Sequence, residues 1–198
     1  MRVSVVHATP MPAATAALIF LDIDGVICCN TRHELEADKM QRLKKIAMET
    51  GAGVVLSSDW RRQKPLKEKV MRALERLKIP YVGCTSQRTK YEDRGSRRWS
   101  VPCRPLEISD WLSRYRKDSM DTCAWVAIDD RELTKEVGGE ALEGHFVRTD
   151  EWWGLTSEGV EQAIAILQGK AADPALPQGP TRIRTLAREV SSVSVHDG

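Results

Sequence analysis

The sequence predicts an α/β fold, a three-layer sandwich in which helices cover both faces of a mostly parallel central sheet. Short apolar runs without helical period alternate with longer amphipathic segments, the order of elements in a parallel sheet with crossover helices. The chain has 198 residues, of which 41% are hydrophobic and 29% charged. This is enough for one globular domain with a core, and it excludes a collagen-like, wholly disordered or membrane-spanning chain.

The predicted strands are short apolar runs that end at a polar residue or a glycine, as buried parallel strands do. The first run, LIFLD, covers residues 18–22 and stops before Gly25. Four later runs share this character: residues 53–56, the weaker run 81–83, residues 124–128 and residues 145–148. Together they predict one sheet.

Four segments have helical periodicity, and they cover residues 38–50, 65–78, 105–115 and 157–168. Gly51 and Gly169 stand where the first and last helices should end. Pro65 and Pro105 stand where the two middle helices should begin. Residues 85–101 are polar, basic and without period, so they predict a long surface loop.

The ordered domain is expected to span residues 18–170. Residues 1–17 form an N-terminal extension, which is apolar enough to suggest a signal peptide. We expect it to lead into a core strand instead, because it has an early Arg2 and two prolines and because the apolar run ends in acidic residues. Residues 171–198 are rich in Pro, Gly, Ala and Ser, which predicts a flexible C-terminal tail.

The cysteines predict a reducing compartment. Their number is odd and no CxxC pair occurs, so we expect free thiols in a cytoplasmic protein, with organellar targeting left open. They are Cys28, Cys29, Cys84, Cys103 and Cys123.

Polar residues follow three of the predicted strands: Asp22-Ile23-Asp24-Gly25, then Ser57-Ser58, then Asp129-Asp130. Each group alone is a weak signal, because turns collect Asp and Ser. A calcium-loop interpretation of the first group fails, since the twelfth residue from Asp22 is His33 rather than Glu. In a parallel sheet, however, all three groups converge on the edge where ligands bind.

An oxygen-rich site of this kind suits Mg²⁺, with Asp22 and Asp129 as the natural ligands. The metal would neutralise a substrate phosphate and let a carboxylate approach it. A protein cation is also expected, and Arg104 is the best candidate. Pro105 places it at the start of a helix, which favours anions. The alternative for Arg104 is a solvated surface side chain.

The strings LIFLDIDGV, VVLSSDWR, RPLEISDWL and WVAIDD resemble the four motifs of the haloacid dehalogenase (HAD) superfamily of phosphohydrolases. SSDWR, the R-x-x-E-I-x-x-W-L helix and TDEWWGLT are similar to a small group of HAD domains, some of them associated with RNA-repair proteins. The resemblance covers roughly residues 18–167. It implies a HAD-like, Rossmann-like fold.

The resemblance assigns catalytic roles to the first motif. Asp22 would be the nucleophile that forms an aspartyl-phosphate. Asp24 would protonate the leaving group and then activate water, while its backbone carbonyl helps to bind Mg²⁺. Dehalogenases lack an acid at this second position. The resemblance therefore favours phosphoryl transfer.

The other motifs would bind phosphate and metal. Ser57 and Ser58 would face the transferring phosphoryl group, and Arg104 would hold its charge. The family usually has Lys in this third motif, which leaves three further candidates for the role: Lys90, Arg97 and Arg98. The implied metal set is Asp22, Asp24, Asp129 and, in support, Asp130.

The spacing leaves no room for a large cap domain, because residues 25–56 and 58–103 are already filled by the predicted elements. By resemblance, capless HAD proteins act on macromolecules or close the site by oligomerising. The sequence leaves the oligomeric state open, and nothing in it predicts a membrane partner.

The net charge of +2 conceals a split. Residues 61–117 carry 17 Lys and Arg against 6 Asp and Glu, a net of +11, which leaves −9 for the rest of the chain. Cationic grooves with aromatic side chains bind single strands, although a solvated loop is the alternative. The predicted substrate-contact residues of this loop are Arg88, Lys90, Arg94, Arg97, Arg98 and Trp99, with Tyr91 as a further aromatic.

The sequence thus predicts a magnesium-dependent HAD phosphatase, a phosphoric monoester hydrolase, whose substrate is a phosphorylated nucleic-acid end or nucleotide. Two alternatives stay open: a protein or small-metabolite phosphatase, and a catalytically idle HAD fold used as a binding module. The intact acidic residues argue against the second, since clustered like charges are unfavourable without a task. Trp152 and Trp153 are expected to pack against the last helix rather than to border the site.

Overall fold

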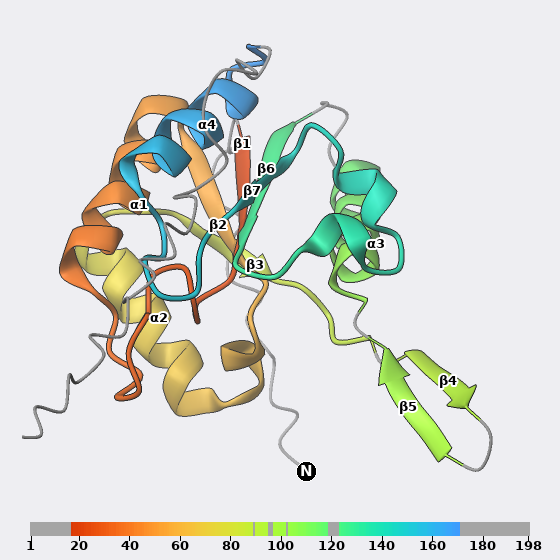
Figure 1. Ribbon diagram of the computed structural model, residues 1–198. Helices are drawn as coiled ribbons and strands as arrows, with labels where there is room; N and C mark the ends of the chain where they lie inside the picture. Colours follow the sequence, from red (N-terminus) through yellow and green to blue (C-terminus); the bar gives the residue numbers. More distant parts are fainter. Residues whose placement is uncertain (1–16, 89, 95–96, 102, 119–122, 171–198) are drawn as a thin grey trace, which may run out of the picture.

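Five parallel strands form the main sheet of the computed structural model, which describes residues 17–88, 90–94, 97–101, 103–118 and 123–170 (Figure 1). Residues 90–94, 97–101 and 116–118 are described by their backbone alone. The N-terminal extension up to residue 16 and the predicted tail lie outside the described residues.

The strand order of the main sheet is β3-β2-β1-β6-β7. The strands are β1 (Ala17–Leu21), β2 (Ala52–Leu56), β3 (Tyr81–Cys84), β6 (Ala124–Asp129) and β7 (Phe146–Arg148). Leu21 is in register with Leu56 of β2 on one side and Ile128 of β6 on the other. The residues that follow these three positions therefore reach the same edge of the sheet. The chain adds β2 and β3 on one side of β1 and later β6 and β7 on the other, so the boundary between β1 and β6 is the switch point of the sheet.

Helices cover both faces, which confirms the predicted three-layer sandwich (Figure 1). One face carries α1 (Ala37–Thr50), α2 (Lys64–Arg76) and α4 (Ser157–Leu167), which pack with Ile19 and Leu21 of β1. The other carries α3 (Arg104–Asp118) and the short 3₁₀ helices η2 (Leu133–Lys135) and η3 (Gly139–Leu142), which pack with Leu18 and Phe20. Alternate β1 residues thus serve opposite layers, and all five are buried.

The stop signals in the sequence have the predicted effect. Gly51 ends α1 in the left-handed conformation, with φ 66°. Pro65 lies in the first turn of α2, where no backbone N–H is needed.

The predicted loop of residues 85–101 is the main correction to the fold. It contains an antiparallel hairpin, β4 (Lys90–Arg94) and β5 (Arg97–Val101), which projects from the body of the domain (Figure 1). The hairpin forms its own two-stranded sheet and pairs with no strand of the main sheet. Because the hairpin lies outside the main sheet, its strands can be polar, and they lacked the apolar run by which the other strands were predicted.

All five cysteines are among the described residues, and no disulfide joins any of them, as predicted. Within the described part of the chain, no helix has both the length and the apolar character needed to cross a membrane.

Candidate active site

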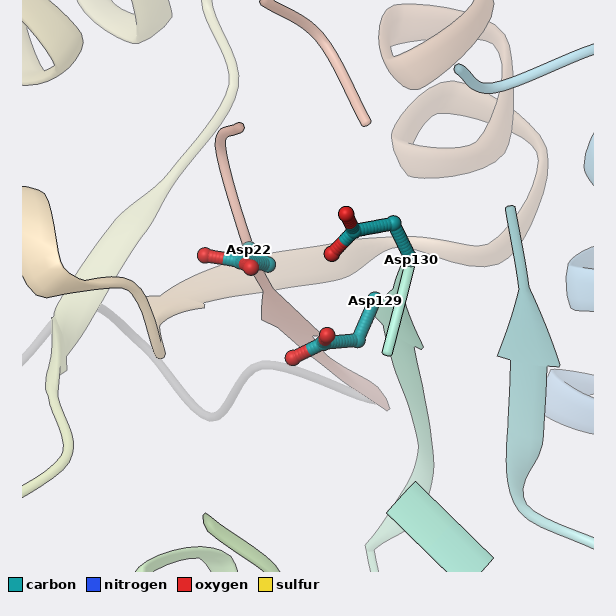
Figure 2. A group of neighbouring side chains, drawn as sticks. All are labelled: Asp22, Asp129 and Asp130. Atoms are coloured by element: carbon teal, nitrogen blue, oxygen red, sulfur yellow. The ribbon is translucent and has the colours of Figure 1, made fainter. Parts of the chain in front are cut away.

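Three aspartates meet where β1 and β6 end (Figure 2). Asp22 follows β1, Asp129 is the last residue of β6 and Asp130 comes next. One carboxylate oxygen of each lies within 4.8 Å of the others. Asp22 and Asp129 are buried, and the Asp22 N–H donates to the Ile128 carbonyl at 3.0 Å. The register of the sheet thus assembles the predicted cluster.

Arg104 lies against this cluster, in the first turn of α3. Its Nη1 is 3.1 Å from Asp22 Oδ1 and 2.9 Å from Asp129 Oδ2. The side chain is buried, so the alternative of a solvated surface arginine does not hold. Burial alone would lower the pKa of the guanidinium, but Asp22 and Asp129 hold that pKa above its usual value. A fixed positive charge therefore faces the carboxylates.

One arginine does not balance three carboxylates. Burial and repulsion by Asp22, opposed by Arg104, raise the pKa of Asp129 to about 7. Burial and the Asp22 charge also raise the pKa of Asp130. The cluster carries two negative charges beyond Arg104 when all three acids are ionised, and its donors are all carboxylate oxygens. This donor set fits a hard divalent cation such as Mg²⁺.

Asp24 lies beside the cluster, on the loop after β1. Its Oδ2 accepts a hydrogen bond from Trp60 Nε1 at 2.9 Å, and Trp60 is buried in the 3₁₀ helix η1 (Asp59–Arg62). Asp24 is exposed, but partial desolvation of its carboxyl, with repulsion by Asp22, raises the pKa of Asp24 despite this hydrogen bond. Its carboxylate is thus fixed by Trp60 and is not one of the three that converge.

Gly25 lets the loop after β1 pass close to Asp130. Its φ is +67°, and a Cβ at this position would lie 2.5 Å from Asp130 Oδ2. The Gly25 carbonyl accepts a hydrogen bond from Thr149 Oγ1 at 2.7 Å. The glycine of the DxDG motif is therefore required by both backbone conformation and space.

The two serines after β2 are both buried. The Ser57 N–H donates to the Leu21 carbonyl at 2.8 Å, which holds it level with the end of β1. The Ser58 hydroxyl accepts from the Trp60 N–H at 3.4 Å and so caps η1. Ser58 thus holds the turn that carries Trp60.

A buried ion pair beside the site was missed by sequence reasoning. Arg61 Nη2 is 2.7 Å from Glu107 Oε2, and both side chains are at most 6% exposed. Arg61 Nη1 donates to the Ser58 carbonyl at 2.5 Å, and Glu107 Oε1 accepts from the Arg88 N–H at 2.7 Å. The available signal was the R-x-x-E spacing, which places Arg104 and Glu107 on one face of α3.

The predicted substrate-contact residues are only partly described. Arg88 is exposed, and its Nε lies 2.6 Å from Asp110 Oδ2 of α3. The side chains of Lys90, Tyr91, Arg94, Arg97, Arg98 and Trp99 lie outside the described part of the structure. Their role stays a prediction.

Trp152 and Trp153 correct another expectation. The prediction that they pack against the last helix is wrong, because 69% of Trp152 and 64% of Trp153 is exposed. Asp150 Oδ1 accepts hydrogen bonds from both of their N–H groups and holds them on a turn instead. They line a groove that also includes Asp130.

The parallel α/β sheet, with clustered carboxylates and a buried arginine at its switch point, is a Rossmann-like domain with a site suited to a divalent cation. Residues 18–160 match the family model of the HAD domain in Swiss Army Knife RNA repair proteins, and the chain belongs to this family. The resemblance found in the sequence is thereby confirmed. No curated protein and no solved structure matches the chain.

Proposed function

We propose that the protein is a magnesium-dependent phosphatase that removes a phosphate from a nucleic-acid end or a nucleotide through an aspartyl-phosphate. The observation that carries the proposal is the cluster of Asp22, Asp129 and Asp130 against Arg104 at the switch point of the sheet. Like charges brought together repel one another, and this repulsion helps to raise the pKa values of Asp129 and Asp130. Such an unfavourable arrangement is expected in a working site rather than in an inactive fold.

Asp22 is the proposed nucleophile, because Arg104 fixes its carboxylate at the centre of the site. A carboxylate oxygen attacks phosphorus while the bond to the leaving oxygen breaks, and Asp24 gives its proton to that oxygen. Asp24 then takes a proton from water, which attacks the phosphorus and releases inorganic phosphate and Asp22. The raised pKa of Asp24 suits the first of these steps.

Asp22, Asp129 and Asp130, with the Asp24 carbonyl, would hold Mg²⁺. When bound, Mg²⁺ supplies a Lewis acid that neutralises the phosphoryl oxygens. Arg104, already desolvated, adds a second positive charge to the same group. Ser57, held at the level of Asp22, supplies a hydroxyl for a phosphoryl oxygen.

Two observations support a nucleic-acid substrate. The family is that of HAD domains in RNA repair proteins. The segment between Ser57 and Asp129 contains residues 61–117, with their net charge of +11, and includes the β4–β5 hairpin. A polyanionic strand would be attracted to the exposed basic side chains of this segment.

The test compares Asp22→Asn with Glu68→Gln, a matched loss of one carboxylate on the surface of α2. We expect Asp22→Asn to abolish Mg²⁺-dependent phosphate release from a generic aryl phosphate, and Glu68→Gln to leave it unchanged. The substrate class is then tested by measuring phosphate release by the wild-type protein from 3'- and 5'-phosphorylated oligonucleotides, nucleotides, sugar phosphates and phosphopeptides. Activity retained by Asp22→Asn contradicts the mechanism, and a preference for sugar phosphates or phosphopeptides replaces the substrate class.

The basic hairpin has its own test. Neutral substitutions at Arg94, Arg97 and Arg98 should weaken oligonucleotide binding and flatten its dependence on salt, because fewer counterions are released. Unchanged affinity and unchanged salt dependence would remove the hairpin from the substrate-binding surface.

A further inference from the structure

Trp152 and Trp153 are adjacent, large and exposed. They lie on the turn between β7 and α4, where 69% and 64% of their surfaces are accessible. Among the described residues, the other exposed large hydrophobic side chains are Met48, at 69%, and Met71, at only 37%. Tryptophan combines a flat apolar surface with one polar N–H, so an exposed pair is typical of a binding surface.

The turn that carries them is held in one conformation. Asp150 Oδ1 accepts from the Trp152 N–H at 2.9 Å and the Trp153 N–H at 3.3 Å, and the Gly154 N–H donates to the Asp150 carbonyl at 2.7 Å. Gly154 has φ +62°, and a Cβ there would lie 2.5 Å from the Val26 carbonyl oxygen. A backbone fixed in this way loses little entropy when a ligand binds.

The groove of the tryptophans reaches the carboxylate cluster at Asp130, which lines it together with Thr149, Trp152 and Trp153. A carboxylate oxygen of Asp22 lies within 4.8 Å of one of Asp130, although Asp22 itself is not part of the lining. Thr149 binds the carbonyl of Gly25, three residues after Asp22, and Leu155 donates to the Val26 carbonyl at 2.8 Å. The turn is thus attached on both sides of the tryptophans to the loop of the proposed nucleophile.

The charge of this groove decides what it accepts. Seven acidic and four basic side chains line it, a net charge of −3. Each of the four bases is already paired with a carboxylate: Lys39 with Glu36, Arg42 with Asp38, Arg131 with Glu136 and Arg148 with Glu132. A chain of phosphates would be repelled here, whereas an uncharged aromatic ring would not.

We propose that this groove binds the terminal nucleobase of the substrate, stacked on Trp152 or Trp153, while its phosphate lies at Asp22. The acidic lining supplies acceptors for the amino groups of a base. It also disfavours a second phosphate in this groove, so the rest of the strand leaves the site elsewhere. The inference rests on the proposed function and assigns that site a preference for nucleotides at the end of a strand.

The test needs one binding and one kinetic measurement on the full chain. Adenosine, which has no phosphate, should quench the tryptophan fluorescence of the protein, and the double variant Trp152→Ala/Trp153→Ala should lose this quenching. In kinetics, the ratio of kcat/KM for a nucleoside monophosphate to that for ribose 5-phosphate should fall by about 5- to 150-fold in the double variant. Met48→Ala, an equally exposed residue of α1, should change neither.

The outcomes separate this inference from the function on which it rests. Quenching that depends on the tryptophans, in a protein that releases no phosphate, supports the base site and contradicts the phosphatase. An active enzyme whose double variant keeps the wild-type ratio overturns the base site and leaves the phosphatase. Quenching by an arginine-rich octapeptide but not by adenosine also overturns it, because the groove would then accept a basic protein segment.

Discussion

Replacing Glu107 with Ala should destabilise the protein strongly, although Glu107 touches neither the proposed nucleophile nor the metal ligands. The change leaves the Arg61 guanidinium with a buried positive charge and without the carboxylate 2.7 Å away. Arg61 Nη1 would keep the Ser58 carbonyl, and Asp59 Oδ1 at 3.8 Å is its remaining ion-pair partner among the described residues. Arg61 Nε already lacks a hydrogen-bond partner in the described structure.

The magnitude follows from the burial of the pair. Removing one partner of a buried ion pair costs about 3–5 kcal/mol, because the other charge stays desolvated. The Arg88 N–H also loses its acceptor, which adds about 1 kcal/mol for a partly exposed group. For a chain of this size, the melting temperature should fall on the order of 10 °C.

Urea unfolding of the full chain measures the effect. Glu75→Ala, an exposed glutamate of α2, is the matched control and should stay within about 0.5 kcal/mol of wild type. Arg61→Met/Glu107→Leu removes both charges and should recover most of the loss, because apolar replacements of buried ion pairs are often neutral. Glu107→Gln keeps one of the two acceptor oxygens and gives a milder, measurable case. A loss below 1 kcal/mol for Glu107→Ala, or a double variant less stable than the single, would refute this reasoning.

Two further predictions concern the carboxylate cluster. Because the pKa of Asp129 is raised to about 7, this carboxyl binds more protons in the folded state without metal than in the unfolded state between about pH 4 and 7, and its contribution to stability should fall as the pH rises through that range. Mg²⁺ should therefore raise the melting temperature more at pH 8 than at pH 5, and an equal rise at both contradicts a metal bound by these acids. Gly25→Ala should destabilise the protein by more than Gly144→Ala, since both have positive φ but only Gly25 faces a side chain, Asp130, at 2.5 Å. Equal losses in urea unfolding would show that backbone strain alone accounts for the change.

The sequence predicted the sheet and the candidate site through the same feature, the buried parallel strand. LIFLD and AWVAI are apolar because both faces of their strands are covered, and the polar residues after them then share one sheet edge. The site residues follow from this alignment without knowledge of any contact. Arg104 required one more signal, the proline that starts its helix.

What the sequence did not reveal depends on contacts between distant residues. Arg61 and Glu107 are 46 positions apart, and each alone is typical of a solvated helix surface. The β4–β5 hairpin pairs only with itself, so no apolar alternation marked its strands. The tryptophans were assigned to the core by their apolar character, but hydrogen bonds from their own N–H groups to Asp150 hold them at the surface.

The near-neutral net charge is the sum of regions with opposite charge, among them the acidic groove and the basic segment of residues 61–117. The groove beside Asp130 is acidic, and all four of its bases are paired. The basic surplus lies in residues 61–117, which include α2 and α3 on opposite faces of the sheet and the hairpin between them. A small monoester would gain little from this separation, because its only charges lie at the carboxylate cluster. A phosphorylated strand end has a neutral base on one side of its phosphate, which suits the acidic groove, and further phosphates on the other, which would be attracted to exposed basic side chains outside the groove.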